Sequence, residues 1–336
     1  MSKARAIEPL PLQIIGCGRY MPERVVTNEE LEKRCNLPPG WIETKTGVRE
    51  RRWVNRKETS PFMGAQAARE ALQDAGIAPN DIDLILNASG SPPRALPDGG
   101  HLIQRELGLG KSGIPCMTVH TTCLSFVSGL NVAAHFLGSG LYRTILVVTS
   151  DISSRSLDFS RPDSAVLLGD GAAAFVVTRT PAGSSSALER FHQVGFGDGA
   201  DLTTVRGMGT TWAPNDPETP PEYNLFYMDG LGIAAMLRGA FNRFFKTLTT
   251  SLESMDQVAA VVPHQANAYA LRALRRYGFP EEKIAKTLDR FGNCVAASIP
   301  VTLYEVIREG RIARGDRVLL IGAGAGLSIG GILLIY

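Results

Sequence analysis

Three residues from separate parts of the chain could together catalyse chemistry on a thioester. Cys123 lies in T-T-C-L-S-F, His264 in V-V-P-H-Q-A-N, and Asn293 at the end of L-D-R-F-G-N. A thiolate can attack a thioester carbonyl, and an imidazole and a carboxamide can donate hydrogen bonds to an oxygen on which negative charge develops. These residue types predict a condensing enzyme that works through an acylated cysteine.

Each of these residues also has a structural interpretation. A buried cysteine often serves as packing, a histidine at a strand end can hydrogen-bond a core carbonyl, and an asparagine after a glycine is typical of turns. Cys123 opens a small, apolar helix whose N-terminal N–H groups and dipole would favour the thiolate. His120 is a rival to His264, but strand alternation should turn it away from Cys123. Cys294 adjoins Asn293, and its side chain should point elsewhere.

The elements that must position these residues follow the same order in both halves of the chain, offset by roughly 155–175 residues. The first half is expected to contain a helix at 64–75, strands at 82–87 and 115–120, a helix starting near Cys123, and strands at 144–148 and 169–177. The expected counterparts are a helix at 235–252, strands at 258–262 and 285–288, a helix starting near Cys294, and strands at 317–321 and 326–334. This agreement in order, spacing and glycine placement indicates an internal duplication.

The fold class follows from the apolar strands. The runs at 145–148 and 318–321 lack alternation, so helices should cover both faces of each sheet. We expect a layered α/β sandwich built twice, with halves at 11–180 and 190–336. Cys123 and either Asn293 or Cys294 would lie at equivalent helix starts, and His264 would match the region of Ser89, so the three groups could meet in one crevice.

Composition excludes several other classes of protein. The chain has 336 residues, 44% hydrophobic and 20% charged, with a formal net charge of +2, which indicates a globular protein without a nucleic-acid surface. Two basic clusters could be solvated or could contact phosphates or an acidic partner. They comprise Arg49, Arg51 and Arg52 in the first half and Arg272, Arg275 and Arg276 in the second.

Cysteine spacing and hydropathy indicate the compartment. The five cysteines show neither the paired spacing of a metal site nor the density of a disulfide scaffold. No apolar run approaches the roughly 18 residues of a membrane span, and no signal-peptide pattern opens the chain. We therefore expect a cytoplasmic protein with no metal and no membrane segment, and a loose tail over the first ten residues.

Two glycine-rich stretches, at 169–172 and 322–326, differ from nucleotide-binding fingerprints. Close approach of the backbone to another group explains them better. In the second stretch, the backbone N–H near Ala325 could join that of Cys123 in an oxyanion hole for a thioester carbonyl.

Six motifs, taken together, resemble a known family. They are G-x-Y-x-P (18–22), W-I-x-x-x-T-G-x-R-E-R (41–51), the segment around Cys123, G-D-G-A (169–172), V-P-H-Q-A-N (262–267) and R-x-G-N-x-x-A-A-S-I-P (290–300). Their order resembles that in β-ketoacyl-acyl-carrier-protein synthase III over nearly the whole chain. The resemblance implies a thiolase-like αβαβα sandwich, a homodimer, no cofactor, and a Cys123–His264–Asn293 site reached through a tunnel for the pantetheine arm of coenzyme A or carrier protein.

The resemblance also implies a mechanism and binding residues. Cys123 would take an acyl group from acyl-coenzyme A, and His264 and Asn293 would stabilise the enolate formed when malonyl-acyl carrier protein or malonyl-coenzyme A loses carbon dioxide. Asn267 would contact pantetheine, and Trp41 would stack on adenine.

Several residues depart from the family pattern where substrate is bound. Tyr269 replaces a basic residue associated with carrier docking, and Lys45 replaces an arginine. Pro162 stands where an arginine would face Trp41, with Arg161 one position away. A smaller residue, Leu96, replaces the aromatic wall of the acyl pocket, and H-T-T-C-L-S-F replaces a segment of small residues.

These departures leave open a specialised acyltransferase of secondary metabolism that uses an acceptor other than a malonyl thioester. A catalytically silent partner subunit is disfavoured by the complete set of three groups. A papain-type hydrolase would need a different cysteine context. The segment at 201–227, rich in Gly, Pro and Thr, is expected to line the tunnel mouth.

Overall fold

The computed structural model describes residues 8–336. The tail expected over the first ten residues lies mostly outside the described residues. Leu10 already pairs with Leu188 through two backbone hydrogen bonds of 2.9 Å.

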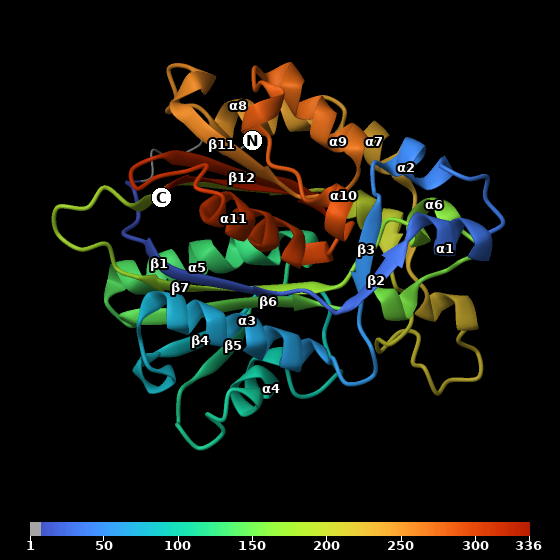
Figure 1. The fold of residues 1–336 in the computed structure, drawn as a ribbon, viewed down its shortest axis with the longest axis horizontal. Helices are drawn as coiled ribbons and strands as arrows, with labels where there is room; N and C mark the ends of the chain where they lie inside the picture. The colour runs from blue at the N-terminus through green and yellow to red at the C-terminus, as the bar shows by residue number, and fades with distance from the viewer. Residues whose placement is uncertain (1–7) are drawn as a thin grey trace.

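Two sheets form the framework (Figure 1). The first has the order β1-β7-β6-β4-β5, and its strands are β1 (Gln13–Tyr20), β7 (Gly171–Thr178), β6 (Thr144–Asp151), β4 (Leu84–Asn87) and β5 (Cys116–Thr118). The second has the order β8-β13-β12-β11, and its strands are β8 (Ala187–Gly195), β13 (Ser328–Ile335), β12 (Arg317–Gly324) and β11 (Val258–Pro263). Three neighbouring strands follow the same pattern in both sheets, an antiparallel pair followed by a parallel pair. They are β7-β6-β4 in the first sheet and β13-β12-β11 in the second. The predicted duplication is therefore visible in the strand order that the two sheets share.

The expected strand at 285–288 is wrong. β5 has no counterpart in the second sheet, where Ile284 forms only an isolated bridge with Val261. The N–H groups of Thr287 and Leu288 bond to the side-chain oxygen of Gln265, each at 3.0 Å, instead of to a neighbouring strand. A side chain has taken the donors that a sheet ladder would need.

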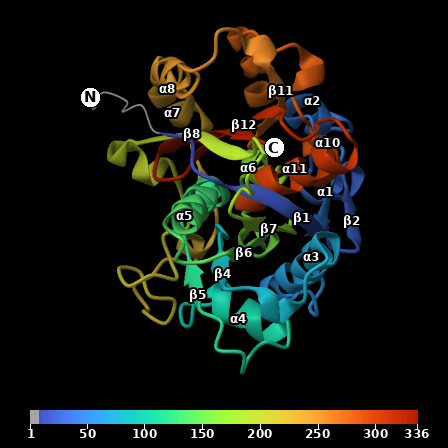
Figure 2. The same ribbon diagram turned by 90° about the vertical axis from the view of Figure 1, so that its left-hand side faces the viewer.

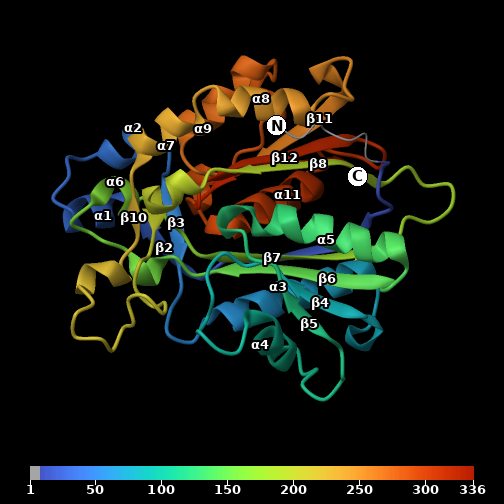
Figure 3. The same ribbon diagram turned by 180° about the vertical axis from the view of Figure 1, so that it is seen from behind.

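Helices cover the sheets in layers (Figures 1 and 2). α3 (Ser60–Ala75) and α4 (Gly99–Glu106) cover the outer face of the first sheet, and α8 (Ala240–Leu248) covers the outer face of the second. α5 (Ser125–Ser139) and α11 (Ser298–Arg308) lie between the two sheets, as Figure 3 also shows from behind. The predicted αβαβα sandwich is confirmed. Its division into halves at 11–180 and 190–336 stays a prediction.

The core explains why the strand runs are apolar on both faces. In β4, Leu84 and Leu86 face the middle helix layer, whereas Ile85 packs under the outer helix α3. In β12, Leu320 faces the middle layer and Leu319 faces α8. The apolar runs of these strands are buried on both faces, so the polar residues that follow them mark the points where the chain leaves the core.

Local sequence sets the helix ends. Thr59 caps α3 by accepting a hydrogen bond from Phe62 N, and Gly76 ends it with φ of 66°. The single helix expected at 235–252 is wrong, because α7 (Gly230–Leu237) and α8 are separate. Gly239, with φ of 75°, breaks the helix between them.

Smaller elements gather at one end of the molecule (Figure 1). They are β2 (Arg24–Thr27), α1 (Asn28–Arg34), α2 (Trp41–Thr46), β3 (Glu50–Trp53), α6 (Pro162–Ala165), β9 (Thr203–Thr204), β10 (Tyr227–Met228), α9 (Ala268–Ala273) and α10 (Leu288–Phe291). Within residues 8–336, each helix is too short or too polar to cross a lipid bilayer.

Candidate active site

The nucleophile candidate lies in a tight turn between β5 and α5. Cys123 is half-buried in a single 3₁₀ turn, Thr122–Leu124, and α5 begins two residues later. The hydroxyl of Ser125 accepts a bond from Thr121 N (3.0 Å) and donates one to Thr122 O (2.7 Å), which fixes the turn. The cysteine thus precedes the helix instead of standing in its first turn.

The environment of the Cys123 thiol differs from the expected one. Burial raises its pKa to about 11, although the nearby backbone N–H groups of Ala325 and of Cys123 itself oppose that rise. The negative charge of Asp151 adds to the increase. Backbone donors favour the thiolate, as expected, but burial outweighs them and the thiol is the resting form.

Glycines of β12 allow the site to assemble. A Cβ atom on Gly322 would lie 2.7 Å from His264 Cβ and 3.3 Å from Leu124 Cδ2. A Cβ on Gly324 would lie 2.9 Å from Thr122 Oγ1 and 3.5 Å from Cys123 N. The expected close approach at 322–326 thus occurs, and it brings the nucleophile turn against the strand that borders His264.

His264 directly follows β11 and is buried. Its backbone N–H bonds to Ile321 O (2.8 Å), and its Nδ1 has no hydrogen-bonding partner within residues 8–336. Burial lowers the imidazole pKa to about 4. The ring is therefore neutral near pH 7 and can donate one hydrogen bond.

Asn293 follows Gly292, whose φ is 67°, in a turn between α10 and α11. Its backbone N–H bonds to Leu167 O (2.8 Å) in the first half of the chain. Its Oδ1 accepts bonds from Val295 N (2.9 Å) and Ser298 Oγ (3.4 Å). Since Oδ1 faces the turn, Nδ2 is left as the donor for a bound molecule.

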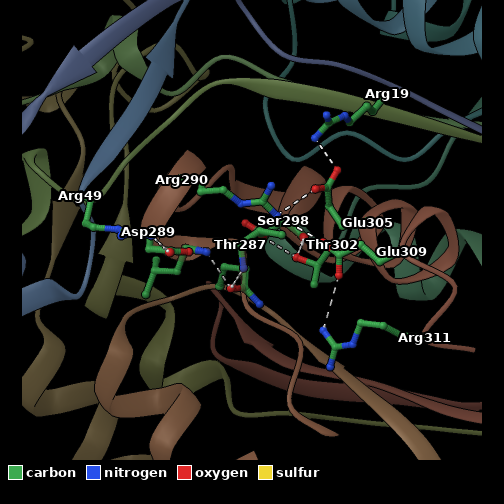
Figure 4. Close-up of polar contacts among 12 residues, drawn as sticks. Arg19, Arg49, Thr287, Asp289, Arg290, Ser298, Thr302, Glu305, Glu309 and Arg311 are labelled. Atoms are coloured by element: carbon green, nitrogen blue, oxygen red, sulfur yellow. Dashed lines mark hydrogen bonds and ion pairs between the residues drawn. The ribbon is translucent and has the colours of Figure 1, made fainter. Parts of the chain in front are cut away.

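Ion pairs connect α10 and α11, the helices on either side of this turn, to other parts of the chain (Figure 4). Glu305 is 8% exposed and pairs with Arg19 of β1 and with Arg290. Asp289 faces Arg49, again across the two halves. These contacts tie the Asn293 turn to the first half of the chain.

Two buried residues of the site were missed from the sequence. Gln265 is fully buried; its Nε2 bonds to Pro263 O (2.9 Å) and Ala285 O (3.2 Å), and its Oε1 accepts the two N–H bonds at the start of α10. It joins the end of β11, next to His264, to the segment that leads to Asn293. Its position beside His264 was the only available signal.

Asp151, at the end of β6, is the second missed residue. Its fully buried carboxylate accepts bonds from Gly90 N (2.8 Å), Ser91 N (2.7 Å), Ser91 Oγ (2.8 Å) and Ala297 N (3.1 Å). Burial raises its pKa to about 6 in spite of these bonds. A carboxylate at the end of an apolar strand was the signal, since such strand ends meet at one edge of the sheet.

The turns before α5 and α11 have the same construction. In each, a residue with φ of 53° is followed by a helix-opening serine whose hydroxyl accepts a backbone N–H bond. The matched residues are Thr121 with Cys294, Thr122 with Val295, and Ser125 with Ser298. The two helix starts are therefore equivalent, as expected, and in the residue-by-residue register Cys123 corresponds to Ala296, not to Asn293 or Cys294.

Gly90 joins these two turns. A Cβ on Gly90 would lie 2.8 Å from Val295 Cγ1 and 3.1 Å from Thr122 O. His120 is exposed and its Nε2 lies 3.1 Å from Gly90 O. Cys294 is buried with its sulfur directed to Phe291 O (3.5 Å).

The residues expected to bind substrate are spread over several elements. Asn267 caps α9 by accepting a bond from Ala270 N (2.9 Å). The start of α9 packs against Gly47, at the end of the helix α2 that carries the half-buried Trp41 and the exposed Lys45.

The other two residues expected to bind substrate, Arg161 and Leu96, lie on other elements. Arg161 stacks over the Tyr227 ring at 4.9 Å and lies 3.7 Å from the Asp158 carboxylate. Tyr227 ends the segment expected to line the tunnel mouth. Leu96 is 85% exposed in the loop before α4.

The basic clusters differ from each other. Arg51 is fully buried and donates hydrogen bonds to Val26 O, Asn28 Oδ1 and Val166 O. Both expectations for it are therefore wrong: it is neither a solvated side chain nor a contact for phosphates or an acidic partner. Arg272, Arg275 and Arg276 are exposed. Within residues 8–336, no group of three or more potential ligands could hold a metal ion, and all five cysteines are free.

Comparisons with known proteins match both parts of the site. Residues 117–195 match the family model described as 3-oxoacyl-[acyl-carrier-protein (ACP)] synthase III, and residues 248–336 match the model for its C-terminal part. A β-ketoacyl-[acyl-carrier-protein] synthase III from Aquifex aeolicus (strain VF5) is 33% identical, over 96% of this chain and 99% of the relative. A β-ketoacyl-[acyl-carrier-protein] synthase III 1 from Bacillus anthracis is 36% identical, over 96% of this chain and 97% of that relative.

The fold agrees with these matches. The crystal structure of 3-oxoacyl-[acyl-carrier-protein] synthase III from Aquifex aeolicus VF5 has a TM-score of 0.85 at 33% identity and covers 97% of this chain and 100% of that chain. Since identity at this level extends over nearly the whole chain and both family models match, this protein belongs to the β-ketoacyl-acyl-carrier-protein synthase III family.

Proposed function

We propose that this protein condenses an acyl primer with a malonyl thioester carried by acyl carrier protein, through an acyl–Cys123 intermediate, and releases a β-ketoacyl thioester. As a synthase III it is an acyltransferase of fatty acid biosynthesis. The comparisons favour this activity over the specialised acyltransferase, because the relatives described above, 33% and 36% identical to this chain, both carry the synthase name. The observation that carries the assignment of Cys123 is the close approach of its turn to the end of β12, where a Cβ on Gly324 would lie 3.5 Å from Cys123 N. The backbone N–H groups of Ala325 and Cys123 act there to favour the thiolate.

Acylation is the first half-reaction. The Cys123 sulfur attacks the carbonyl carbon of acyl-coenzyme A, and the coenzyme A sulfur departs with the proton that the thiol loses. The N–H groups of Cys123 and Ala325 stabilise the oxyanion of the tetrahedral intermediate. Because the pKa of the free thiol is raised to about 11, ionisation has to be coupled to substrate binding in this scheme.

Condensation is the second half-reaction. The malonyl thioester loses its carboxylate as carbon dioxide, and the electron pair of the broken bond forms an enolate. His264 and Asn293 Nδ2 donate hydrogen bonds to the enolate oxygen, a role that suits a neutral imidazole and an amide that does not titrate. The enolate carbon attacks the acyl carbon, and Cys123 leaves as thiolate and regains a proton.

Substrate delivery is proposed from the elements around the site. The pantetheine arm passes beside the contact of α2 with the start of α9, near Asn267, and Trp41 receives the adenine of coenzyme A. Contact between Gly47 and Ala268 supports this route because it places the two elements side by side. Lys45 and Arg161 remain candidates for phosphate contacts, and the exposed Arg272 suits an acidic carrier.

We further propose a homodimer that works in the cytoplasm. β5 is an edge strand of its sheet and carries the exposed Met117. Thr118 of β5 donates a hydrogen bond to Asp98, so the loop that exposes Leu96 lies beside the same edge. A second copy would cover this unpaired edge and its apolar side chains. The five free cysteines are suited to a reducing compartment.

Intact-protein mass spectrometry tests the proposal. The protein is incubated with acyl-coenzyme A donors of different chain length and then chased with malonyl-acyl carrier protein. We expect one acyl group per chain, lost on the chase together with release of a β-ketoacyl product, and no label on Cys123→Ala. A label that survives the chase would contradict the condensation, and a label on Cys123→Ala would contradict the choice of nucleophile.

A further inference from the structure

Thr122, the residue before the nucleophile, has an unusual backbone conformation. Its φ of 53° lies in the left-handed region, which β-branched residues rarely adopt. Val295, the matching residue in the second turn, has the same φ. The conformation is therefore imposed by the fold in both halves, and a side chain without a hydroxyl is compatible with it.

The hydroxyl of Thr122 contacts the strand end that carries the second oxyanion donor. Its Oγ1 lies 2.7 Å from Thr121 O and 3.1 Å from Ala325 O, and the two carbonyls share its single proton. The contact with Ala325 spans 203 positions of the chain and joins the two halves. Gly324 leaves the space for it, since a Cβ there would lie 2.9 Å from Oγ1.

The Thr122 hydroxyl joins Thr122 to Ala325, and each of these two residues is close to one of the proposed oxyanion donors. Cys123 N belongs to the peptide group that follows Thr122, and Ala325 itself bears the other N–H. The hydrogen bond from Thr122 restrains Ala325 at its carbonyl group, which lies on the other side of the residue from its N–H. The hydroxyl thus restrains the spacing of two donors that come from different halves of the protein.

We propose that Thr122 is a positioning residue for the oxyanion hole and accelerates acylation of Cys123 without touching the substrate. The inference rests on the proposed function, because the spacing of the donors matters only if an acyl–Cys123 intermediate forms. Small displacements of preorganised donors are costly: loss of a whole donor lowers turnover about 10²- to 10³-fold.

Thr122→Val and Thr122→Ser form the matched pair of variants. Valine keeps the β-branched shape, which Val295 shows to be compatible with this backbone, and lacks the hydroxyl. Serine keeps the hydroxyl. In stopped-flow acylation with an acyl-coenzyme A donor, we expect Thr122→Val to lower the maximal rate about 10- to 100-fold with a near-normal KM, and Thr122→Ser to stay near the wild-type rate.

Alkylation by iodoacetamide distinguishes an effect on the oxyanion hole from a general disturbance of the Cys123 site, because a general disturbance would slow alkylation as well. Displacement at the iodoacetamide carbon forms no oxyanion, although the Ala325 N–H also favours the thiolate. We therefore expect the alkylation rate of Thr122→Val per thiolate, with the thiolate fraction read from its pH profile, to match the wild type. Gly324→Ala, which crowds the hydroxyl from the other side, should show the same split between slowed acylation and normal alkylation.

Three outcomes would overturn the inference. They are normal acylation of Thr122→Val, a loss of acylation matched by an equal loss of alkylation per thiolate, and a Thr122→Ser variant as slow as Thr122→Val. Absence of acyl-enzyme in the wild-type protein with every donor would instead remove the proposed function and the inference with it.

Discussion

Asp151 and His264 are both buried, and their pKa values are displaced so that they affect stability in opposite directions. Burial lowers the pKa of His264 from 6.5 to about 4, and it raises the pKa of Asp151 from 3.8 to about 6. Between these pH values the folded protein holds His264 neutral and Asp151 protonated. Unfolding therefore takes up one proton at the histidine and releases one at the aspartate.

The two contributions have calculable signs and sizes. Because the unfolded state binds more protons at His264, that residue makes stability rise as pH increases from about 4 to 6.5, at about 1.4 kcal/mol per pH unit and about 3 kcal/mol in all. Asp151 makes stability fall as pH increases from 3.8 to about 6, again by about 3 kcal/mol. In the wild-type protein the two slopes largely cancel.

Single substitutions should expose each slope. We expect the free energy of unfolding of Asp151→Asn, relative to wild type, to rise with pH by about 1.4 kcal/mol per unit below pH 6. His264→Asn should show the opposite trend between about pH 4 and 6.5. The loss of an acceptor for Ala297 N in Asp151→Asn adds an offset that does not depend on pH.

Urea unfolding from pH 4.5 to 7.5, at constant protein concentration, measures these differences. The double variant should return to the wild-type slope, which is the internal control. Curves of both single variants that run parallel to wild type would refute the reasoning, because they would show that neither buried group changes its proton occupancy on unfolding.

Three other predictions concern catalysis, packing and assembly. Asn293→Ala should form acyl–Cys123 at nearly the wild-type rate yet condense about 10²- to 10³-fold more slowly in single-turnover assays, and unchanged condensation would contradict its role as an enolate donor. Gly90→Ala should lower the free energy of unfolding by about 1–3 kcal/mol in urea, since its Cβ would lie 2.8 Å from Val295 Cγ1, and an unchanged midpoint would show that the turns can separate. Met117→Asp should shift a dimer towards monomer in sedimentation velocity, and a dimer that persists at low concentration would place the interface elsewhere.

The layered fold was predictable because its signals are local. Apolar runs, glycines and helix caps lie in consecutive positions, and their repetition along the chain indicated a duplication before any contact was known. The failures have physical reasons. The strand expected at 285–288 lost its N–H donors to Gln265, and the helix expected at 235–252 is interrupted where Gly239 adopts a positive φ.

The chemistry-bearing side chains of the site could be nominated from residue type, but their environment could not. Asp151 contacts Gly90 and Ala297, which are far from it in sequence, so no local pattern reveals that four hydrogen bonds hold a buried carboxylate there. The pKa of Cys123 likewise depends on burial by both halves. Such properties arise only when the two sheets close over the middle helices.

The paired turns before α5 and α11 have a further consequence for how activity can change over time. The same backbone presents a thiol at Cys123 and a methyl group at the matching Ala296, while the serine that secures each turn is present in both. A duplicated scaffold of this kind separates the reacting group from the structure that holds it. A substitution at the position of Cys123 or Ala296 can therefore change the reacting group while the serine-secured turns keep their structure.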